Sequence, residues 1–383
     1  MALFKGSDNV NDVLSGADFA DTFIPGTSLD ISTGDFVDGG AGNDLLIIDY
    51  SSQASGIIGT GGTNGSLSSS MSKVTYVNIE RFDITATDFA DDIRGGNFSD
   101  VLRGGKGDDV INGLKGNDTI IGGDGNDILR GGDGDDNISG GNGNDVLNGG
   151  GGTDTMVGGT GNDIYFVDRP TDAITENANE GYDTIFSSLD LSIASLANVE
   201  ALTLINGSNA VKATGNDDDN KITGNQRDNI LSGGAGNDRI AGGTGNDRLL
   251  GEDGADVLLG EDGDDLLIGG LGGDRLTGGA GADRFRFENA GQGVDVINDF
   301  SVGEDKIEFS RSGFGLSLPI GALSANNFVL GSAAADANDL FIYDSATGKL
   351  LFDSNGSASG GVATLAVMSK GLNLSSSDFR IVA

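Results

Sequence analysis

The 383-residue sequence has no cysteine, no histidine and no tryptophan, and it has only 3 prolines. The lack of cysteine excludes disulfide bonds and thiolate chemistry. The lack of histidine excludes HExxH zinc sites, Ser–His and Cys–His nucleophile pairs, and imidazole proton relays. A catalytic site in this chain would have to use carboxylates, lysine, tyrosine or hydroxyl groups.

Basic residues are also scarce: 22 Lys and Arg stand against 59 Asp and Glu, which gives a formal net charge of -37. Nucleic acids and anionic membranes bind clustered basic residues, so we expect neither as a partner. No apolar run approaches the roughly 18 residues of a membrane span, and the first residues, MALFKGSDNVNDVLSG, do not resemble a Sec-type signal peptide. Such acidity favours cations as partners, or it serves solubility alone, and without cations it predicts disorder of the acidic repeat regions.

Glycine, by contrast, is abundant, with 68 residues, and much of it recurs with a period of nine. The repeat is G-G-x-G-x-D-x-U-x, where U is a large apolar residue. It runs without insertion over residues 104–166 and 233–286, and an isolated copy lies at 39–47. A weaker copy, with Phe98 in place of the third glycine, precedes the first array. The aspartates at position six are Asp44, Asp100, Asp109, Asp118, Asp127, Asp136, Asp145, Asp154, Asp163, Asp238, Asp247, Asp256, Asp265, Asp274 and Asp283.

A period of nine is neither helical nor heptad. We interpret x-U-x as a short strand with U pointing inward, and the six-residue glycine-rich segment as a turn. Two repeats, 18 residues, then complete one coil, and each coil is stable only against its neighbours. The predicted fold class is all-β: a parallel β-roll or β-helix solenoid with terminal β caps. The eighth positions, predicted to form the core, are Ile111, Ile120, Leu129, Ile138, Leu147, Met156 and Tyr165, then Ile240, Leu249, Leu258, Leu267, Leu276 and Phe285.

The same spacing predicts a metal site. Loops 18 residues apart would face each other in successive coils, and each would offer an aspartate and the carbonyl oxygens of a glycine-rich turn. About six or more oxygen ligands suit Ca²⁺ better than Mg²⁺, which requires a near-octahedral shell. A cation would also offset the repulsion between the carboxylates and the entropic cost of ordering the glycines. A solvated turn would accept Asn or Ser equally well at position six, which argues against a merely structural aspartate.

These repeats resemble those of the RTX family, the repeats-in-toxin or haemolysin-type calcium-binding proteins, whose defining motif is GGxGxDxUx. The resemblance implies Ca²⁺ between one loop and the next loop on the same side. The first loop gives the carbonyls of positions two and four, the second gives those of positions one and three, and both give aspartate. One such set is Gly123, Gly125 and Asp127 with the corresponding residues of the loop that ends at Asp145.

Carried along the arrays, the resemblance implies about nine or more ions, about five in the first array and about four in the second. Asn220 and Asn229 replace the aspartate in the coils before the second array, so we expect no calcium there. At 114 the motif's second glycine is a leucine, and we retain that carbonyl in the predicted set. The carbonyl ligands so predicted are those of Gly105, Gly107, Leu114, Gly116, Gly123, Gly125, Gly132, Gly134, Gly141, Gly143, Gly234, Gly236, Gly243 and Gly245.

The repeats divide the chain into five expected segments. Residues 1–94 form an N-terminal β-solenoid or cap with one isolated repeat, and 95–167 form the first calcium array. Residues 168–214 form solenoid linker coils without calcium, and 215–286 form the second array, whose first two coils are of the Asn type. Residues 287–383 form a C-terminal β cap, and its tail GLNLSSSDFRIVA resembles the family's type I secretion signal.

Repeats and caps occupy nearly the whole chain, so we expect a secreted, non-enzymatic calcium-binding protein of the cell surface or extracellular matrix. The expected partners are calcium ions and the type I secretion machinery, with self-association or contact with a surface polysaccharide left open. The alternative is a glycan-acting enzyme, a carboxylate-based hydrolase, lyase or epimerase, because parallel β-helices host such sites without histidine. A pore-forming toxin is disfavoured because the sequence has no apolar or amphipathic membrane segment.

One outward-facing pattern has two interpretations. Val110, Ile128, Val146 and Ile164 occupy position seven at 18-residue steps and should stack on one sheet. β-branched residues suit strands anywhere, which is the interpretation that we favour, and a docking face for another chain is the alternative. In the second array arginines take this position and should soften the acidic self-repulsion.

Overall fold

The computed structural model describes residues 2–5, 13–24, 35–53, 55–59, 61–68, 73–356 and 360–383. It divides into two compact units, residues 1–186 and 187–383, and each is described by itself. Both are built from short β-strands, with two single turns of 3₁₀ helix, η1 (Ala325–Asn327) and η2 (Ser376–Asp378), among the described residues. No described helix is long and apolar enough to span a membrane.

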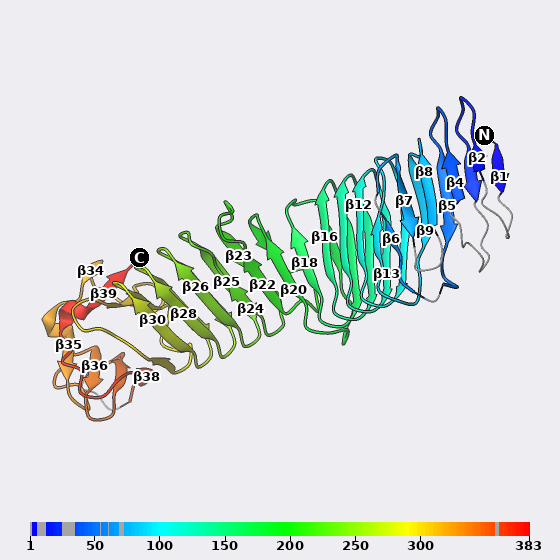
Figure 1. Cartoon of the computed structure of the whole chain (residues 1–383). Helices are drawn as coiled ribbons and strands as arrows, with labels where there is room; N and C mark the ends of the chain where they lie inside the picture. Colours follow the sequence, from blue (N-terminus) through cyan, green and yellow to red (C-terminus); the bar gives the residue numbers. More distant parts are fainter. Residues whose placement is uncertain are drawn as a thin grey trace. The chain divides into compact units, whose positions relative to one another are not determined.

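The first unit is a parallel solenoid with two sheets (Figure 1). One sheet stacks nine parallel strands in chain order: β1 (Leu3–Lys5), β3 (Thr22–Ile24), β5 (Leu45–Asp49), β9 (Arg81–Thr85), β11 (Val101–Lys106), β13 (Thr119–Asp124), β15 (Asn137–Asn142), β17 (Thr155–Thr160) and β19 (Ala173–Thr175). The other contains β2 (Val13–Ser15), β4 (Asp35–Asp38), β6 (Ile58–Gly59), β7 (Gly65–Ser68), β8 (Lys73–Val77), β10 (Asp92–Arg94), β12 (Val110–Lys115), β14 (Ile128–Asp133), β16 (Val146–Gly151), β18 (Ile164–Val167) and β20 (Thr184–Ser187).

The second unit repeats this plan and ends in a different arrangement. One sheet holds β21 (Leu191–Ser192), β23 (Lys212–Thr214), β25 (Ile230–Ala235), β27 (Arg248–Asp253), β29 (Leu266–Leu271), β31 (Arg284–Phe287), β33 (Lys306–Ser310), β39 (Phe379–Val382) and β34 (Gly321–Ala322). The other holds β22 (Ala201–Leu204), β24 (Lys221–Thr223), β26 (Arg239–Thr244), β28 (Val257–Asp262), β30 (Arg275–Ala280), β32 (Asp295–Ile297), β38 (Val362–Val367), β37 (Lys349–Asp353), β36 (Phe341–Asp344) and β35 (Phe328–Leu330).

Strand pairing has the predicted 18-residue step, and the expected parallel solenoid is confirmed. Val101 pairs with Thr119 and Ile120 with Ile138 in one sheet, and Ile111 pairs with Leu129 in the other. The position-eight side chains of both arrays point inward and are at most 1% exposed. Each coil therefore contributes two large apolar residues to a narrow core that continues from coil to coil within a unit.

The strands are longer than the sequence predicted. We expected three-residue strands and six-residue turns, but a strand such as β14 covers positions seven to nine and continues through positions one to three of the next repeat. The reason is that the paired glycines stay in register: Gly105 lies opposite Gly123, and Lys106 opposite Asp124. Only positions four to six remain for the turn, so the aspartate is the last residue of each turn.

Two segments outside the repeats contain antiparallel strand pairs. The Gly/Ser-rich stretch 51–72 contains β6 and β7, which pair antiparallel with each other; residues 54, 60 and 69–72 lie outside the described part. The segment D-S-A-T-G forms the turn of a hairpin, in which β36 pairs antiparallel with β37. The fragment SDNVNDVLS at 7–15 lies mostly outside the described residues.

The outward position-seven residues align as predicted. Val110 lies opposite Ile128, Ile128 opposite Val146, and Val146 opposite Ile164, so they form a continuous apolar stripe across β12, β14, β16 and β18. Val110 is 36% exposed and the other three are half-buried. The stripe is a solvent-facing feature of the first unit, since these side chains point away from the core.

The turn glycines give a test of the fold. Gly125 has φ +140°, and a Cβ on it would overlap the carbonyl group of Gly107, one coil earlier. Gly125→Ala should therefore destabilise the calcium-loaded protein by about 1–3 kcal/mol, as measured by urea unfolding. Gly151→Ala is the matched control, because residue 151 lacks a positive φ and the nearest atom to its Cβ would be 3.4 Å away. Equal stability of the two variants would contradict the close packing of successive loops.

Candidate calcium-binding loops

The position-six aspartates form a regular ladder. In each array the backbone N–H of one aspartate donates to Oδ1 of the aspartate one coil later: Asp109 to Asp127 at 2.8 Å, Asp127 to Asp145 at 2.8 Å, and Asp145 to Asp163 at 2.7 Å. The second array repeats the pattern, with Asp238 donating to Asp256 at 2.8 Å. The structure thus brings the predicted aspartates of each side together in a row.

The other carboxylate oxygen, Oδ2, is buried and has no hydrogen-bond partner. Desolvating an anionic oxygen without a partner is costly, so a row of such atoms predicts a cation. Two of the fifteen predicted aspartates, Asp100 and Asp283, are not in this group. The aspartates whose Oδ2 is buried without a partner are Asp44, Asp109, Asp118, Asp127, Asp136, Asp145, Asp154, Asp163, Asp238, Asp247, Asp256, Asp265 and Asp274.

A carbonyl oxygen lies beside most of these Oδ2 atoms. Asp127 Oδ2 and the carbonyl oxygen of Gly140 lie so close to the Cα of Gly122, at position one, that a Cβ at residue 122 would overlap both. We call the place where these two oxygens meet the glycine the glycine hollow of a repeat. Both bordering oxygens belong to the ligand positions that the RTX resemblance implies. The donor set is therefore all oxygen, as calcium requires.

The corresponding two oxygens border the hollows of Gly95, Gly104, Gly113, Gly122, Gly131 and Gly140 in the first array and of Gly233, Gly242, Gly251 and Gly260 in the second. The number of bound ions stays a prediction. At the isolated repeat, the hollow of Gly39 is bordered by Asp44 Oδ2 and the carbonyl oxygen of Asn78.

Burial raises the pKa of the ladder carboxyls. Desolvation is the largest cause and raises the pKa of Asp109 to about 8, of Asp118 to about 7 and of Asp127 to about 6. The backbone N–H bonds oppose this shift, and neighbouring aspartates add to it for Asp109 and Asp118. Without a cation, these sites hold protons more tightly than the same residues do in water.

Three coils depart from the motif, and in each of them a hydrogen bond within the loop satisfies the side-chain oxygen at position six. Asp100 Oδ2 accepts the N–H of Gly96 at 2.5 Å, within its own loop. Asn220 Oδ1 accepts the N–H of Asn216, and Asn229 Oδ1 accepts that of Asn225, both at 2.7 Å. In all three the loop's own backbone N–H donates to the position-six side chain, and this distinguishes Asp100 from the other predicted ligands.

Leucine at 114 does not change the loop. Leu114 has φ +78°, and Glu252 and Glu261 take the same second position with φ +78° and +77°. Gly105 and Gly123, at the equivalent position, have φ +111° and +123°. The backbone at residue 114 thus has a positive φ like that of the glycines, so its carbonyl can occupy the predicted position. A non-glycine residue is sterically strained in this conformation.

The ladder also includes aspartates that the sequence prediction missed. Asp91 donates its N–H to Asp109 Oδ1, and the Oδ1 atoms of Asp183, Asp295 and Asp305 accept the N–H groups of the last array aspartates, at 2.8–3.1 Å. The signal is a half-motif, G-x-D-x-U, in GYDTI, GVDVI and GEDKI. For Asp183, Asp295 and Asp305 the strict nine-residue frame missed this half-motif because two to four extra residues precede each copy. Asp91 keeps the 18-residue step to Asp109 and lies in the looser copy ATDFADDIR.

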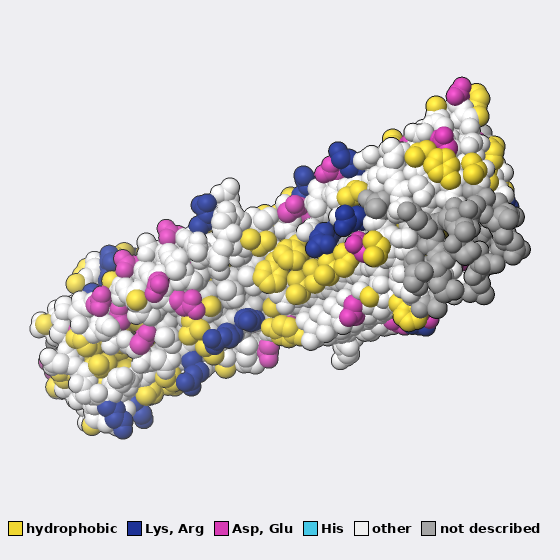
Figure 2. Space-filling view, in the orientation of Figure 1, with side chains coloured by type: hydrophobic (Ala, Val, Ile, Leu, Met, Phe, Trp, Pro, Cys, Tyr) yellow, Lys and Arg dark blue, Asp and Glu magenta, His cyan; other side chains and the backbone are white. Residues whose placement is uncertain are grey.

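Many of the acidic side chains are therefore buried inside the coils. On the face that Figure 2 shows, acidic side chains lie in small groups among basic and hydrophobic ones rather than in one continuous field. The position-six carboxylates of the arrays are at most 2% exposed. Their charge must be neutralised inside the coils, which surface counterions cannot do.

A family model matches these segments. It describes the RTX calcium-binding nonapeptide repeat, in four copies, and it matches residues 33–47, 85–120, 94–129, 107–138, 130–165, 214–249 and 250–285. The chain carries RTX calcium-binding nonapeptide repeats. Calcium is the ion that RTX repeats imply, and the residues present fit it.

Comparisons with whole proteins are less specific, and no curated protein matches the chain. Among solved structures, the AlgE6R3 subunit of the Azotobacter vinelandii mannuronan C5-epimerase is 26% identical, over 43% of this chain and 78% of that one, with a TM-score of 0.22. The extracellular lipase LipA from Serratia marcescens is 17% identical, over 80% of this chain, with a TM-score of 0.22. This chain covers 41% of that lipase. We base no functional argument on either similarity.

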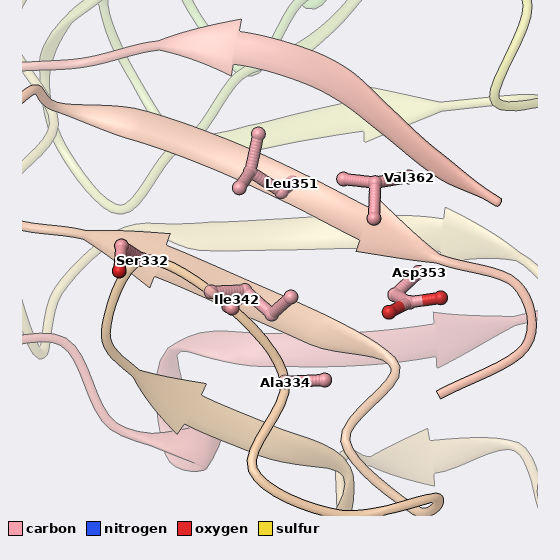
Figure 3. A pocket seen from close by; sticks show the side chains of 7 residues that line it. Ser332, Ala334, Ile342, Leu351, Asp353 and Val362 are labelled. Carbon is pink, nitrogen blue, oxygen red and sulfur yellow. The ribbon is translucent and has the colours of Figure 1, made fainter. Parts of the chain in front are cut away.

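A pocket outside the arrays is lined mainly by apolar residues. It lies in the second unit between β36, β37 and the segment 332–334, has a volume of about 140 Å³, and is shown in Figure 3. Ile342, Leu351 and Val362 line it, and Asp353 is the one charged residue of its lining. The Asp353 side chain accepts the backbone N–H of Asn355 at 3.1 Å, so it closes a turn.

Replacing Asp127 and Asp145 together by Asn tests the ligand assignment. Asn keeps an Oδ1 that can accept the ladder hydrogen bond, but it removes the charged Oδ2, so at least one ion should be lost. At calcium 100 times its Kd, one lost site lowers the free energy of unfolding by about 2.7 kcal/mol. Asp108→Asn with Asp135→Asn is the control, because both residues are exposed at position five. Native mass spectrometry counts the ions, and an unchanged count contradicts the assignment.

The raised pKa values predict the pH dependence of the metal-free protein. Between about pH 4 and pH 8 the folded state keeps protons on groups such as Asp109 that the unfolded chain, with a pKa near 3.8, has released. Stability without calcium should thus fall as pH rises through this range. Urea unfolding in metal-depleted buffer measures it. Asp109→Asn should flatten the slope, whereas Asp217→Asn, which removes an exposed charge away from the ladder, should not; equal slopes would refute the buried carboxyl as the cause.

Proposed function

We propose that this chain is a secreted, non-enzymatic calcium-binding protein of the cell surface or extracellular matrix, whose arrays fold on binding calcium after export. The observation that carries the proposal is the row of buried aspartate Oδ2 atoms that have no partner within the protein. A solenoid with such an interior is unfavourable without cations and becomes stable when they are supplied.

The calcium level then decides where the chain folds. Extracellular calcium modules bind at roughly 10⁻⁴–10⁻³ M, far above the free calcium of a cytosol. Inside the cell the acidic arrays would remain unfolded, which is the state that a type I secretion channel passes. Because neighbouring coils share contacts along the whole ladder, ordering should be cooperative within each array.

The packing of the C-terminal tail is consistent with a secretion signal that a transporter reads before the chain folds. In the folded second unit β39 pairs with β33, and Phe379 and Ile381 are buried. Asp378 accepts the N–H of Gly303 at 3.1 Å and that of Ser375 at 2.8 Å. A segment packed in this way is accessible to a transporter only while the chain is unfolded, so we propose that calcium-driven folding hides it after export.

Two features support a structural role: the burial of the position-six carboxylates and the exposed apolar stripe. In the arrays the position-six carboxylates are buried in the coils, where a polysaccharide cannot reach them. The apolar stripe Val110, Ile128, Val146 and Ile164 offers a flat face for self-association or for another surface chain. Self-assembly is therefore part of the proposal, with the stripe as its contact face.

A calcium titration of the full chain tests this proposal. Circular dichroism should show disorder in chelator at pH 7.5 and a cooperative gain of β structure near millimolar calcium, and light scattering should report assembly. Ile128→Thr with Val146→Thr should keep the calcium transition and reduce assembly. A chain that is fully ordered in chelator, or a calcium-loaded monomer that cleaves or epimerises a polysaccharide, would contradict the proposal and favour the enzyme alternative.

A further inference from the structure

The first array does not simply stop after Asp163. The row that contains Asp127 and Asp145 continues for one more coil, because the N–H of Asp163 donates to Asp183 Oδ1 at 2.8 Å. This step has 20 residues instead of 18. Asn179, at position two of the added loop, has φ +67°, so the loop keeps the left-handed turn without the usual glycine.

The extra coil places a glutamate where the repeat has a glycine. β19 pairs with β17 so that Thr175 lies opposite Val157, and the next residue, Glu176, follows opposite Gly158. In the repeats before it this position is glycine, and its carbonyl oxygen borders the glycine hollow of the previous coil. At Gly158 the hollow is bordered by Asp163 Oδ2, by Glu176 Oε1 and by the Tyr165 hydroxyl.

Three carboxylates therefore converge at the end of this row. Asp163, Glu176 and Asp183 each present an oxygen, and these oxygens lie within 4.8 Å of one another. Independently of this clustering, Asp163 is 0% exposed and its Oδ2, which borders this space, has no hydrogen-bond partner. The Tyr165 hydroxyl donates to Glu176 Oε1 and fixes the orientation of that side chain.

We propose that Asp163, Glu176 and Asp183 bind an additional divalent cation, a calcium ion, which closes the row at the end of the first array. The proposal builds on calcium-dependent folding, but its ligand set differs from that of the repeats: the Glu176 carboxylate takes the place of a loop carbonyl. Three carboxylates at such distances repel strongly in a buried site, and a hard cation with flexible oxygen coordination relieves that repulsion.

The site has a structural consequence. Each inner repeat loop lies between the loop of the preceding coil and the loop of the following coil. The last loop of a row has no following repeat loop. A carboxylate supplies a full negative charge where a carbonyl supplies a partial one. The Glu176 site would thus hold the last loop as firmly as the inner loops, and it would join β19 and the loop before β20 to the ordered array.

The test is Glu176→Gln in the full calcium-loaded chain. Gln keeps an oxygen that accepts the Tyr165 hydroxyl, but it removes the charge. Native mass spectrometry should count one ion fewer than in the wild type. The matched control is Glu180→Gln, four residues along, because Glu180 accepts its hydrogen bonds from Asn177 and is outside the cluster. The control should keep the wild-type count.

Terbium provides a second readout, because Tyr165 borders the site and can sensitise Tb³⁺ luminescence. Glu176→Gln should remove part of the tyrosine-sensitised signal. Tyr165→Phe should reduce that signal while the calcium count stays unchanged, since the hydroxyl is not one of the proposed ligands.

An unchanged ion count in Glu176→Gln, or an undiminished terbium signal in Tyr165→Phe, would overturn the inference and assign Glu176 a proton shared with Tyr165. Failure of the proposed function gives a different result: the wild type itself would then fold equally well in chelator. The two failures are therefore distinguishable in one set of measurements.

Discussion

The burial of one carboxylate oxygen in every repeat is the constraint on which the rest of this structure depends. Thirteen of the fifteen predicted position-six aspartates keep Oδ2 inside without a hydrogen-bond partner, while Oδ1 accepts a backbone N–H from the preceding coil, as Asp145 Oδ1 does from Asp127. An apolar core of one large residue per repeat cannot offset an interior of anions. We therefore propose that the ionised fold depends on a bound cation, so that cation binding and folding are coupled.

The glycines follow from the same constraint. A carbonyl oxygen can approach Oδ2 only if the residue beside it has no Cβ, as at Gly122, and successive loops can stack only if residues such as Gly125 accept a positive φ. The entropic cost of ordering so many glycines is then a consequence of the metal site. Leu114, Glu252 and Glu261 mark the one loop position where a side chain can point to solvent at positive φ.

Much of this was predictable from the sequence because the repeat is strict. The period of nine gave the coil length, the parallel register, the inward Ile and Leu residues and the aspartate rows, since the side chains of a solenoid repeat with the backbone. The strand lengths were wrong because glycine was taken as a turn residue, whereas Gly105 and Gly123 are paired strand residues.

What the sequence did not reveal lies where the period breaks. Asp183, Asp295 and Asp305 extend the ladders after insertions of two to four residues, which a fixed frame cannot follow. Glu176 approaches Asp163 only through the register of β19 on β17, a long-range property that no local motif records. Asp100 fits the motif, yet its own loop satisfies its carboxylate.

Hydrogen–deuterium exchange of the backbone amides, compared with and without calcium, tests the central claim most directly. The N–H groups of Asp109, Asp127 and Asp238 donate within the ladders and should exchange slowly only when calcium is bound. Removal of calcium should bring the exchange of both arrays close to that of an unfolded chain. Equal protection in calcium and in chelator at neutral pH would show that the coils hold without a cation and would contradict the account.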